Sequence, residues 1–319
     1  MDDFRADLHF LARRGPAQPV KAMPAYMTAA MTPEDAFRAT VSDCLAQVTA
    51  NAGTLRSGRS VEGLHQLRVG FRRLDVTLGA FGKEFGLPWL EELRSRGKVL
   101  SSRLASARDL DVFLFDLLDA PQAAAGRGER DSFDALRAQA ERARDIAWGE
   151  ACECVTGEDF AMFQDDVAAL AQSRLPLGRQ QNLPGLAERL LRRQARRVKT
   201  RGRTAASREA RDLHHLRIAL KKLRYAAEFF ASLYPNKKSR RYLKKMRQLQ
   251  DYLGELNDIA HVRATVSKLM RSEERTEARC DLGFAAGAVT GWYGGREGRI
   301  VKQTLKRYRK FRRLKPFWN

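Results

Sequence analysis

Two short segments of this sequence carry cationic side chains that share one face of a helix. Their members, spaced three or four residues apart, are His65, Arg68 and Arg72 in the first segment and His214, Arg217, Lys221 and Arg224 in the second. Like charges at such spacing repel each other by about 0.2–0.5 kcal/mol per pair. A chain of phosphates lying along either row would remove this repulsion and accept charge-assisted hydrogen bonds. The spacing therefore predicts the binding of an extended polyanion.

Four further basic residues extend this prediction beyond the two rows. Arg73 and Lys222 follow Arg72 and Lys221 directly, so they point about 100° away from the rows. They are included as anion contacts, although solvation or pairing with acids would also explain them. Arg96 and Lys245 lie on the next expected helix and are included on weaker grounds.

The histidines and the nearby acids have structural interpretations as well. A lone histidine near the start of a helix is usually a packing or capping residue, but His65 and His214 occupy the same place in both rows. This recurrence favours contact with an anion, which would make protonation of the imidazole easier. Asp109 and Asp258 are interpreted as local structural acids at a helix junction.

The segments that must position the rows form an internal repeat. Residues 64–69 (LHQLRV) reappear as residues 213–218 (LHHLRI), at an offset of 149 residues. Phe81 matches Phe230 at the same offset, and the register continues without a gap to Asp109 and Asp258. This predicts one fold duplicated within the chain, with a period too long for a short-repeat solenoid.

Nearly all of the chain after residue 31 favours helix. Leu, Ala, Arg and Glu dominate, apolar residues recur every three or four positions, and no alternating strand pattern persists. Thr32 and Pro33 predict the first helix start. The repeated segments predict a core stripe made of Leu64, Leu67, Phe71, Leu74 and Leu78 in one copy and Leu213, Leu216, Leu220 and Leu223 in the other. Phe311, Leu314 and Phe317 are expected to pack inward from a basic C-terminal helix. The predicted fold class is all-α.

Charge and composition limit the class of protein. The 319 residues carry a net charge of +21 and are 44% hydrophobic, which is enough for a core and excludes wholesale disorder. Residues 189–247 hold 21 lysines and arginines against three acids. Four cysteines are too few for a disulfide scaffold, and no apolar run is long enough to cross a membrane. We therefore expect a cytoplasmic protein with a polyanionic partner and no membrane contact.

The repeated segments resemble the signature of the CHAD family, the conserved histidine α-helical domain. The resemblance lies in residues 64–69 with Arg72-Arg73-Leu74, in residues 213–218 with Lys221-Lys222-Leu223-Arg224-Tyr225, in residues 108–112 and 256–259, and in residues 315–318. It runs from about Thr32 to the end of the chain. Because the signature occurs twice at a fixed offset, we regard it as specific.

The resemblance implies a fold and a ligand. It implies two four-helix bundles related by a pseudo-twofold axis, here residues 32–175 and 182–319, with a basic groove or pore between them that binds inorganic polyphosphate. Association with polyphosphate granules and their proteins is implied too. Residues 1–31 are predicted to be a flexible extension. The sequence departs from the pattern at Asp75, which stands where the second copy has Arg224.

The expected activity is binding without catalysis, and no cofactor or metal is expected. Upstream triphosphate-processing domains of the family carry a Glu-x-Glu-x-Lys motif, which is absent here. The main alternative is nucleic-acid binding, which a pI of about 10.4 permits. However, the rows lack interleaved aromatic residues, and neither helix-turn-helix nor zinc-finger spacing occurs. A metal-dependent phosphoester hydrolase using His65, His214, Asp109 and Asp111 is a third possibility, but no metal-ligand spacing favours it.

Overall fold

The computed structural model describes residues 18–23, 26–126, 129–175, 182–272 and 276–318, and in these residues every regular element is a helix. The predicted all-α class is confirmed. The main helices are α2 (Pro33–Ser57), α3 (Val61–Phe85), α4 (Leu90–Arg103), α5 (Ala105–Val112), α6 (Asp119–Ala124), α7 (Arg130–Thr156), α8 (Glu158–Gln172), α9 (Leu183–Thr204), α10 (Ala210–Phe229), α11 (Lys237–Ser272) and α12 (Thr276–Phe311). None of the described helices is long and apolar enough to cross a bilayer.

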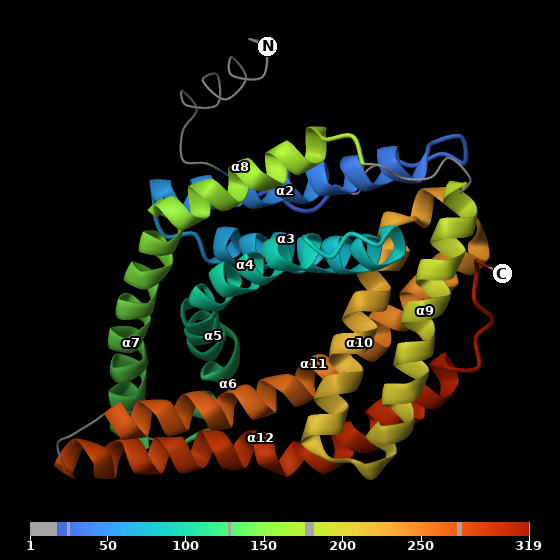
Figure 1. Cartoon of the computed structure of the whole chain (residues 1–319). Helices are drawn as coiled ribbons and strands as arrows, with labels where there is room; N and C mark the ends of the chain where they lie inside the picture. Colours follow the sequence, from blue (N-terminus) through green and yellow to red (C-terminus); the bar gives the residue numbers. More distant parts are fainter. Residues whose placement is uncertain (1–17, 24–25, 127–128, 176–181, 273–275, 319) are drawn as a thin grey trace.

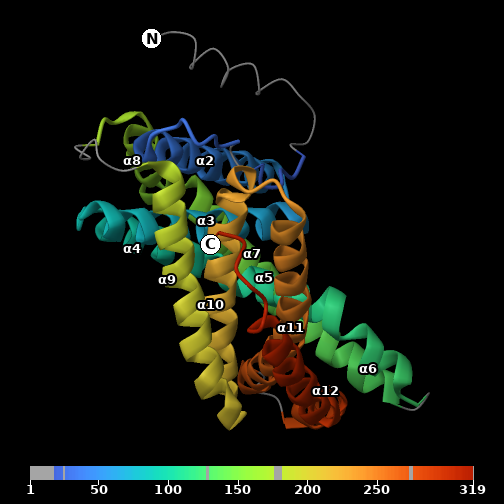
Figure 2. The same ribbon diagram turned by 90° about the vertical axis from the view of Figure 1, so that its right-hand side faces the viewer.

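The helices form a frame around α5 in the view of Figure 1. There, α2, α3, α4 and α8 lie across the top, while α11 and α12 run along the bottom. The left side is closed by α7, which packs against α12, and the right side by α9 and α10. Figure 2 shows α9, α10 and part of α11 standing next to one another. This arrangement brings α3 and α10, which carry the two predicted rows, into contact.

The helix bounds follow the offset found in the sequence. Shifting residues 33–57 by 149 gives 182–206, close to α9, and shifting 61–85 gives 210–234, close to α10. The same shift places α4 and α5 over α11, and α7 over α12. Helix α8 has no counterpart after α12 among the described elements. The internal duplication itself stays a prediction.

Local sequence signals set the ends of the helices that hold the rows. Thr32 accepts a hydrogen bond from the backbone N–H of Asp35 at 3.1 Å, which confirms the predicted start of α2. Ser60 caps α3 in the same way, through Gly63 N at 3.0 Å. Helix α3 ends at Gly86, whose φ of 66° is the left-handed conformation that glycine tolerates best.

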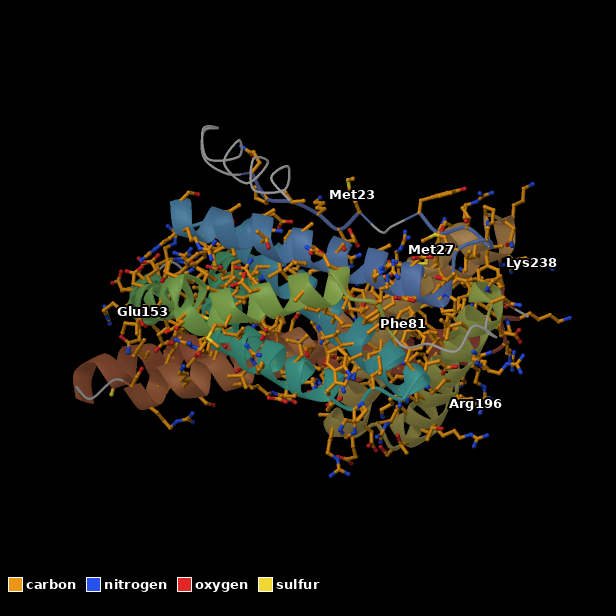
Figure 3. All side chains as sticks on the ribbon, turned by 45° about the horizontal axis from the view of Figure 1, so that its top comes forward. Met23, Met27, Phe81, Glu153, Arg196 and Lys238 are labelled. Carbon is orange, nitrogen blue, oxygen red and sulfur yellow. The ribbon has the colours of Figure 1, made fainter. Side chains whose placement is uncertain are left out.

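The two predicted core stripes are buried, and the two halves meet through aromatic rings. All nine stripe residues are at most 4% exposed. The rings of Phe81 and Phe230, matched by the repeat, lie 6.1 Å apart between centroids, and Phe37 packs on Phe81 at 5.1 Å. Figure 3 shows Phe81 among the helices, whereas Arg196 and Lys238 project from the surface. Burial of apolar side chains contributes about 25 cal/mol per Å², so this shared core holds α3 against α10.

Both chain ends include segments that pack on this core. In the predicted extension, Asn51 exchanges hydrogen bonds with the backbone of Val20 at 3.0 and 2.8 Å, and Met27 is buried. Residues 1–17 and 24–25 lie outside the described residues. At the other end, Phe311 and Phe317 are buried and Leu314 packs against the core, so the predicted inward packing is confirmed.

Candidate functional site

The two cationic rows face each other across α3 and α10. Burial lowers the pKa values of Lys221 and Arg217 on α10, and the charge of Arg72 on α3 lowers both further. Burial also lowers the pKa of His65 on α3, and the charge of Lys221 adds to that shift. Such effects require short separations in a poorly solvated region. Each row lies beside the buried leucine stripe of its own helix, so core packing fixes its direction. The structure therefore gathers the row members from both halves into one cationic surface.

On α3, backbone carbonyls hold two arginines in place. Arg68 donates from Nη1 to the carbonyl oxygen of Ser101 at 2.8 Å, and Arg72 donates from Nε to the carbonyl oxygen of Arg68 at 3.1 Å. Burial, with the charges of Arg72 and Arg108, lowers the pKa of Arg68 to about 10, although Asp109 opposes this shift. At neutral pH Arg68 is still charged, so α3 presents a fixed pair of guanidinium groups.

On α10, the row carries buried donors without partners. The Nε atoms of Arg217 and Arg224 are buried and lack a hydrogen-bond acceptor among the described residues. Burial and the charges of Arg72, Arg217 and Arg224 lower the pKa of Lys221 to about 6, against a smaller opposing effect of Asp258. Buried polar groups are satisfied in the great majority of cases, and leaving one unsatisfied costs about 1–3 kcal/mol. These donors therefore favour an anionic ligand.

The two repeated acids lie beside the rows. The charges of Arg68, Arg108 and Arg72 act on Asp109, and the charge of Arg217 acts on Asp258; burial nevertheless raises the pKa of both carboxyl groups. His261 of α11 lies between them, with Nε2 3.5 Å from Oδ1 of Asp109. These acids thus face the cationic surface, a position that the assignment to a helix junction did not anticipate. The recurrence of both acids at the 149-residue offset of the rows was the sequence signal that could have indicated this position.

A cavity of about 370 Å³ opens beside the α3 row. Arg68, Arg72, Arg94, Lys98 and Asp75 contribute its charged lining. Oδ1 of Asp75 lies 2.7 Å from Nε of Arg94 and 3.8 Å from Nζ of Lys98. The cavity extends the cationic surface from α3 to α4.

Sequence reasoning missed both basic residues that α4 adds. Lys98 matches the basic Arg247 at the repeat offset, which was a usable signal. Arg94 matches Leu243 and gave none. Lys222, by contrast, was predicted, and the structure places its Nζ 4.0 Å from Oδ2 of Asp75, on the cavity side rather than within the α10 row. Three cations from both halves of the chain therefore converge on the carboxylate of Asp75.

Comparison with known families and structures identifies the fold. A model of the CHAD domain matches residues 39–267. The chain belongs to the CHAD family. The solved structure of the CHAD domain from the plant Ricinus communis aligns over 91% of this chain and 96% of that chain, with 25% identity and a TM-score of 0.79.

A second solved structure and a search of curated proteins complete the comparison. PptA from Streptomyces chartreusis aligns over 87% of this chain and 98% of its own, with a TM-score of 0.65; at 20% identity it shows the fold alone. No curated protein matched the chain. The match of the CHAD model over residues 39–267 confirms the family resemblance of the repeated segments.

One predicted site residue of this CHAD protein needs correction. Arg73 is only 2% exposed and forms an ion pair with Asp43 of α2. Its Nη1 donates to Oε1 of Gln47 at 2.7 Å, and its guanidinium lies 5.5 Å from the ring centroid of Phe229. Because Arg73 points about 100° away from the row, its side chain lies between α2 and α3 and packs there. The alternative interpretation of Arg73, pairing with an acid, is therefore the one that the structure supports.

The two CHAD-site residues that the sequence supported on weaker grounds have local partners outside the rows. Arg96 forms an ion pair with Asp166 of α8, and Lys245 is exposed, with Nζ 3.2 Å from Oε1 of Gln248. Neither residue lines the cavity beside the α3 row. The ion pair directs Arg96 toward α8, and a part for Lys245 in the site stays a prediction.

The low pKa of Lys221 predicts that binding of a polyanion takes up a proton. Near pH 8 the free amine is largely neutral, whereas an anion beside it favours the charged form. We expect uptake of about one proton on binding at pH 8, and an affinity that falls as the pH rises from 6 to 8. Burial also lowers the pKa values of His65 and His214, and these histidines add to the proton uptake below about pH 6.5.

Calorimetry in two buffers of different ionisation enthalpy measures the proton uptake. Lys221→Arg should bind without it near pH 8, because arginine stays charged there. Binding by the unmodified protein with no proton exchange at pH 8 would show that Lys221 does not contact the anion.

Proposed function

We propose that this CHAD protein binds inorganic polyphosphate, without catalysis, along the facing rows of α3 and α10. The observation that carries the proposal is the pair of buried Nε donors of Arg217 and Arg224 without a hydrogen-bond acceptor among the described residues, together with the nearly neutral amine of Lys221; Nη1 of Arg224 lies 3.9 Å from Oε1 of Glu228. A linear phosphate polymer supplies one anionic group after another at the spacing of a helical row. It would satisfy these donors and relieve the repulsion between the rows.

The chemistry of the site favours polyphosphate over nucleic acid. The rows are partly buried between two helices, where a thin polymer without bases fits better than a duplex. The aromatic ring beside the α10 row, that of Tyr225, already lies 5.0 Å from the guanidinium of Arg224 and is itself buried, so it offers no exposed platform for a base. The proposal includes association with polyphosphate granules, because these granules concentrate the same polymer.

A non-catalytic role agrees with the position of Asp111, which the hydrolase alternative requires. Asp111 is fully buried, 2.6 Å from Nε of Arg144 and 3.1 Å from Nε1 of Trp148. This carboxylate links α5 to α7 and has no solvent-exposed surface that a substrate could reach. The test for catalysis is phosphate release from polyphosphate over time with added Mg²⁺ or Mn²⁺, which we expect to stay at the level of a protein-free blank.

A competition experiment tests the ligand. Labelled long-chain polyphosphate is bound at about 0.15 M salt, and unlabelled polyphosphate or duplex DNA is added at equal phosphate concentration. We expect polyphosphate to displace the label at least about tenfold more effectively than DNA. Equal or better displacement by DNA would favour the nucleic-acid function instead.

Asp75 is expected to weaken polyphosphate binding, because its carboxylate competes for Arg94, Lys98 and Lys222. Asp75→Asn should raise the affinity about three- to tenfold, the equivalent of about 1 kcal/mol. The measurement is a titration monitored by fluorescence anisotropy. Asp145→Asn, which removes a carboxylate paired with Arg59 on the surface, is the control and should change little. A lower affinity of the Asp75 variant would contradict this role.

A further inference from the structure

A second basic cavity lies between the end of α9 and α12. Its volume is about 350 Å³, within the lower range of small-molecule sites. Four arginines contribute to its lining. They come from α9, from the turn after it, from the last turn of α12 and from the turn that follows α12: Arg203, Arg208, Arg309 and Arg312. None of these residues belongs to the rows on α3 and α10.

The charge of this cavity is poorly compensated. Among the described residues, no acidic side chain forms an ion pair with any of the four arginines. The carboxyl-terminal ends of α9 and α12 lie nearby, and each helix end supplies about half a negative charge. Together they offset about one of the four positive charges. The four arginine side chains are solvent-exposed, so a net of about three positive charges surrounds the mouth of this cavity.

The floor of the cavity is rigidly built. Tyr308 is buried, and its hydroxyl donates to the carbonyl oxygen of Lys199 at 3.3 Å. Its ring packs directly on Gly202, where an added Cβ would lie only 1.9 Å from the ring atom Cζ. Burial raises the pKa of Tyr308, and the charges of Arg312 and Arg203 oppose this, so both guanidinium groups lie close to the ring. The side chains around the floor thus have a fixed support.

Arg208 enters the cavity from an unusual backbone conformation. Its φ of 67° is positive, and it is the one non-glycine residue with a positive φ in the described part of the chain. Such a conformation costs about 1–2 kcal/mol for a residue with a side chain. The turn is held by a hydrogen bond from its N–H to the carbonyl oxygen of Ala205 at 3.2 Å. This strained residue, an arginine rather than glycine, completes the basic ring.

The cavity shares no lining residue with the rows. Helix α10 packs against α9 and against α11, and its row faces α3 and the Asn257–Asp258 segment of α11. The second cavity is lined instead by residues from the end of α9, from the turn after it and from the end of α12. A ligand there would not share contacts with one bound along the rows.

We propose that this cavity is a separate binding site for a short run of linked phosphates. An oligophosphate such as tripolyphosphate carries the several negative charges needed to balance the site, and arginine forks match phosphate oxygens through paired hydrogen bonds. Orthophosphate, with about two charges, leaves part of the site unbalanced. A linked-phosphate site in this cavity does not depend on whether the rows bind polymer.

Calorimetric titration with tripolyphosphate tests the site. We expect two binding sites in the unmodified protein, and loss of one of them in the variant R203Q/R312Q. The matched control is K302Q/K306Q, which removes two exposed lysines from α12 outside the cavity and should keep both sites. Circular dichroism checks that each variant stays helical.

The design separates this inference from the proposed function. If the rows bind no phosphate, R203Q/R312Q still removes the remaining site and R217Q/K221Q changes nothing. If R203Q/R312Q binds tripolyphosphate with unchanged stoichiometry and affinity, the second site is refuted. Orthophosphate should bind the R217Q/K221Q variant at least about tenfold more weakly than tripolyphosphate does. Equal affinity would overturn the assignment to linked phosphates.

Discussion

Replacing Arg217 and Lys221 by glutamate is expected to lower the affinity for polyphosphate by at least about 100-fold near 0.15 M salt. Both residues belong to the α10 row and face Arg72 of α3. The change removes two charge-assisted contacts, each worth about 1.5–3 kcal/mol, and adds two charges that repel the polymer. The measurement is anisotropy with labelled long-chain polyphosphate at several salt concentrations. The dependence of affinity on salt should become shallower as well, because fewer counterions are released.

The control for this variant is R240E/R241E, which reverses two exposed charges on α11. It should cost only a few-fold in affinity, through the general field of the protein. If the α10 variant fails to fold, R217Q/K221Q removes the charges without reversal and is expected to bind about tenfold more weakly or worse. Unchanged affinity in the helical α10 variants would refute the placement of polyphosphate along the rows.

Replacing Arg73 by alanine is expected to destabilise the protein by about 3 kcal/mol and leave its polyphosphate affinity within about threefold. Arg73 is buried against Asp43, Gln47 and Phe229, so its loss strands a carboxylate between α2 and α3. Breaking a buried ion pair costs about 3–5 kcal/mol, and the partial exposure of Asp43 favours the lower end. Urea denaturation gives the free energy of unfolding.

A double-mutant cycle identifies the cause of this loss. If the ion pair dominates, D43A/R73A should be less destabilised than the sum of the two single variants. A large loss of polyphosphate affinity in a folded Arg73→Ala protein would return this residue to the binding surface.

The sequence determined the features of this protein that depend on local spacing. Residues three and four apart share a helix face whatever the helix packs against, so the spacing alone was enough to separate the leucine stripes from the cationic stripes. The recurrence at an offset of 149 residues supported the family signature, and the helix-favouring composition and periodicity indicated the correct all-α class. Caps such as Thr32 were predictable because their hydrogen bonds are local as well.

Tertiary structure alone decided which helix faces meet. Arg72 and Arg73 are neighbours of the same type, yet one lies in the cationic surface and the other is buried on Asp43, because α2 covers only one side of α3. Arg94 reaches the site by the packing of α4 on α3, which no periodicity encodes. The low pKa of Lys221 likewise arises from burial and from cations on two helices. The physical reason is that spacing along one helix fixes directions around its own axis, whereas contacts between distant segments depend on how the whole core packs.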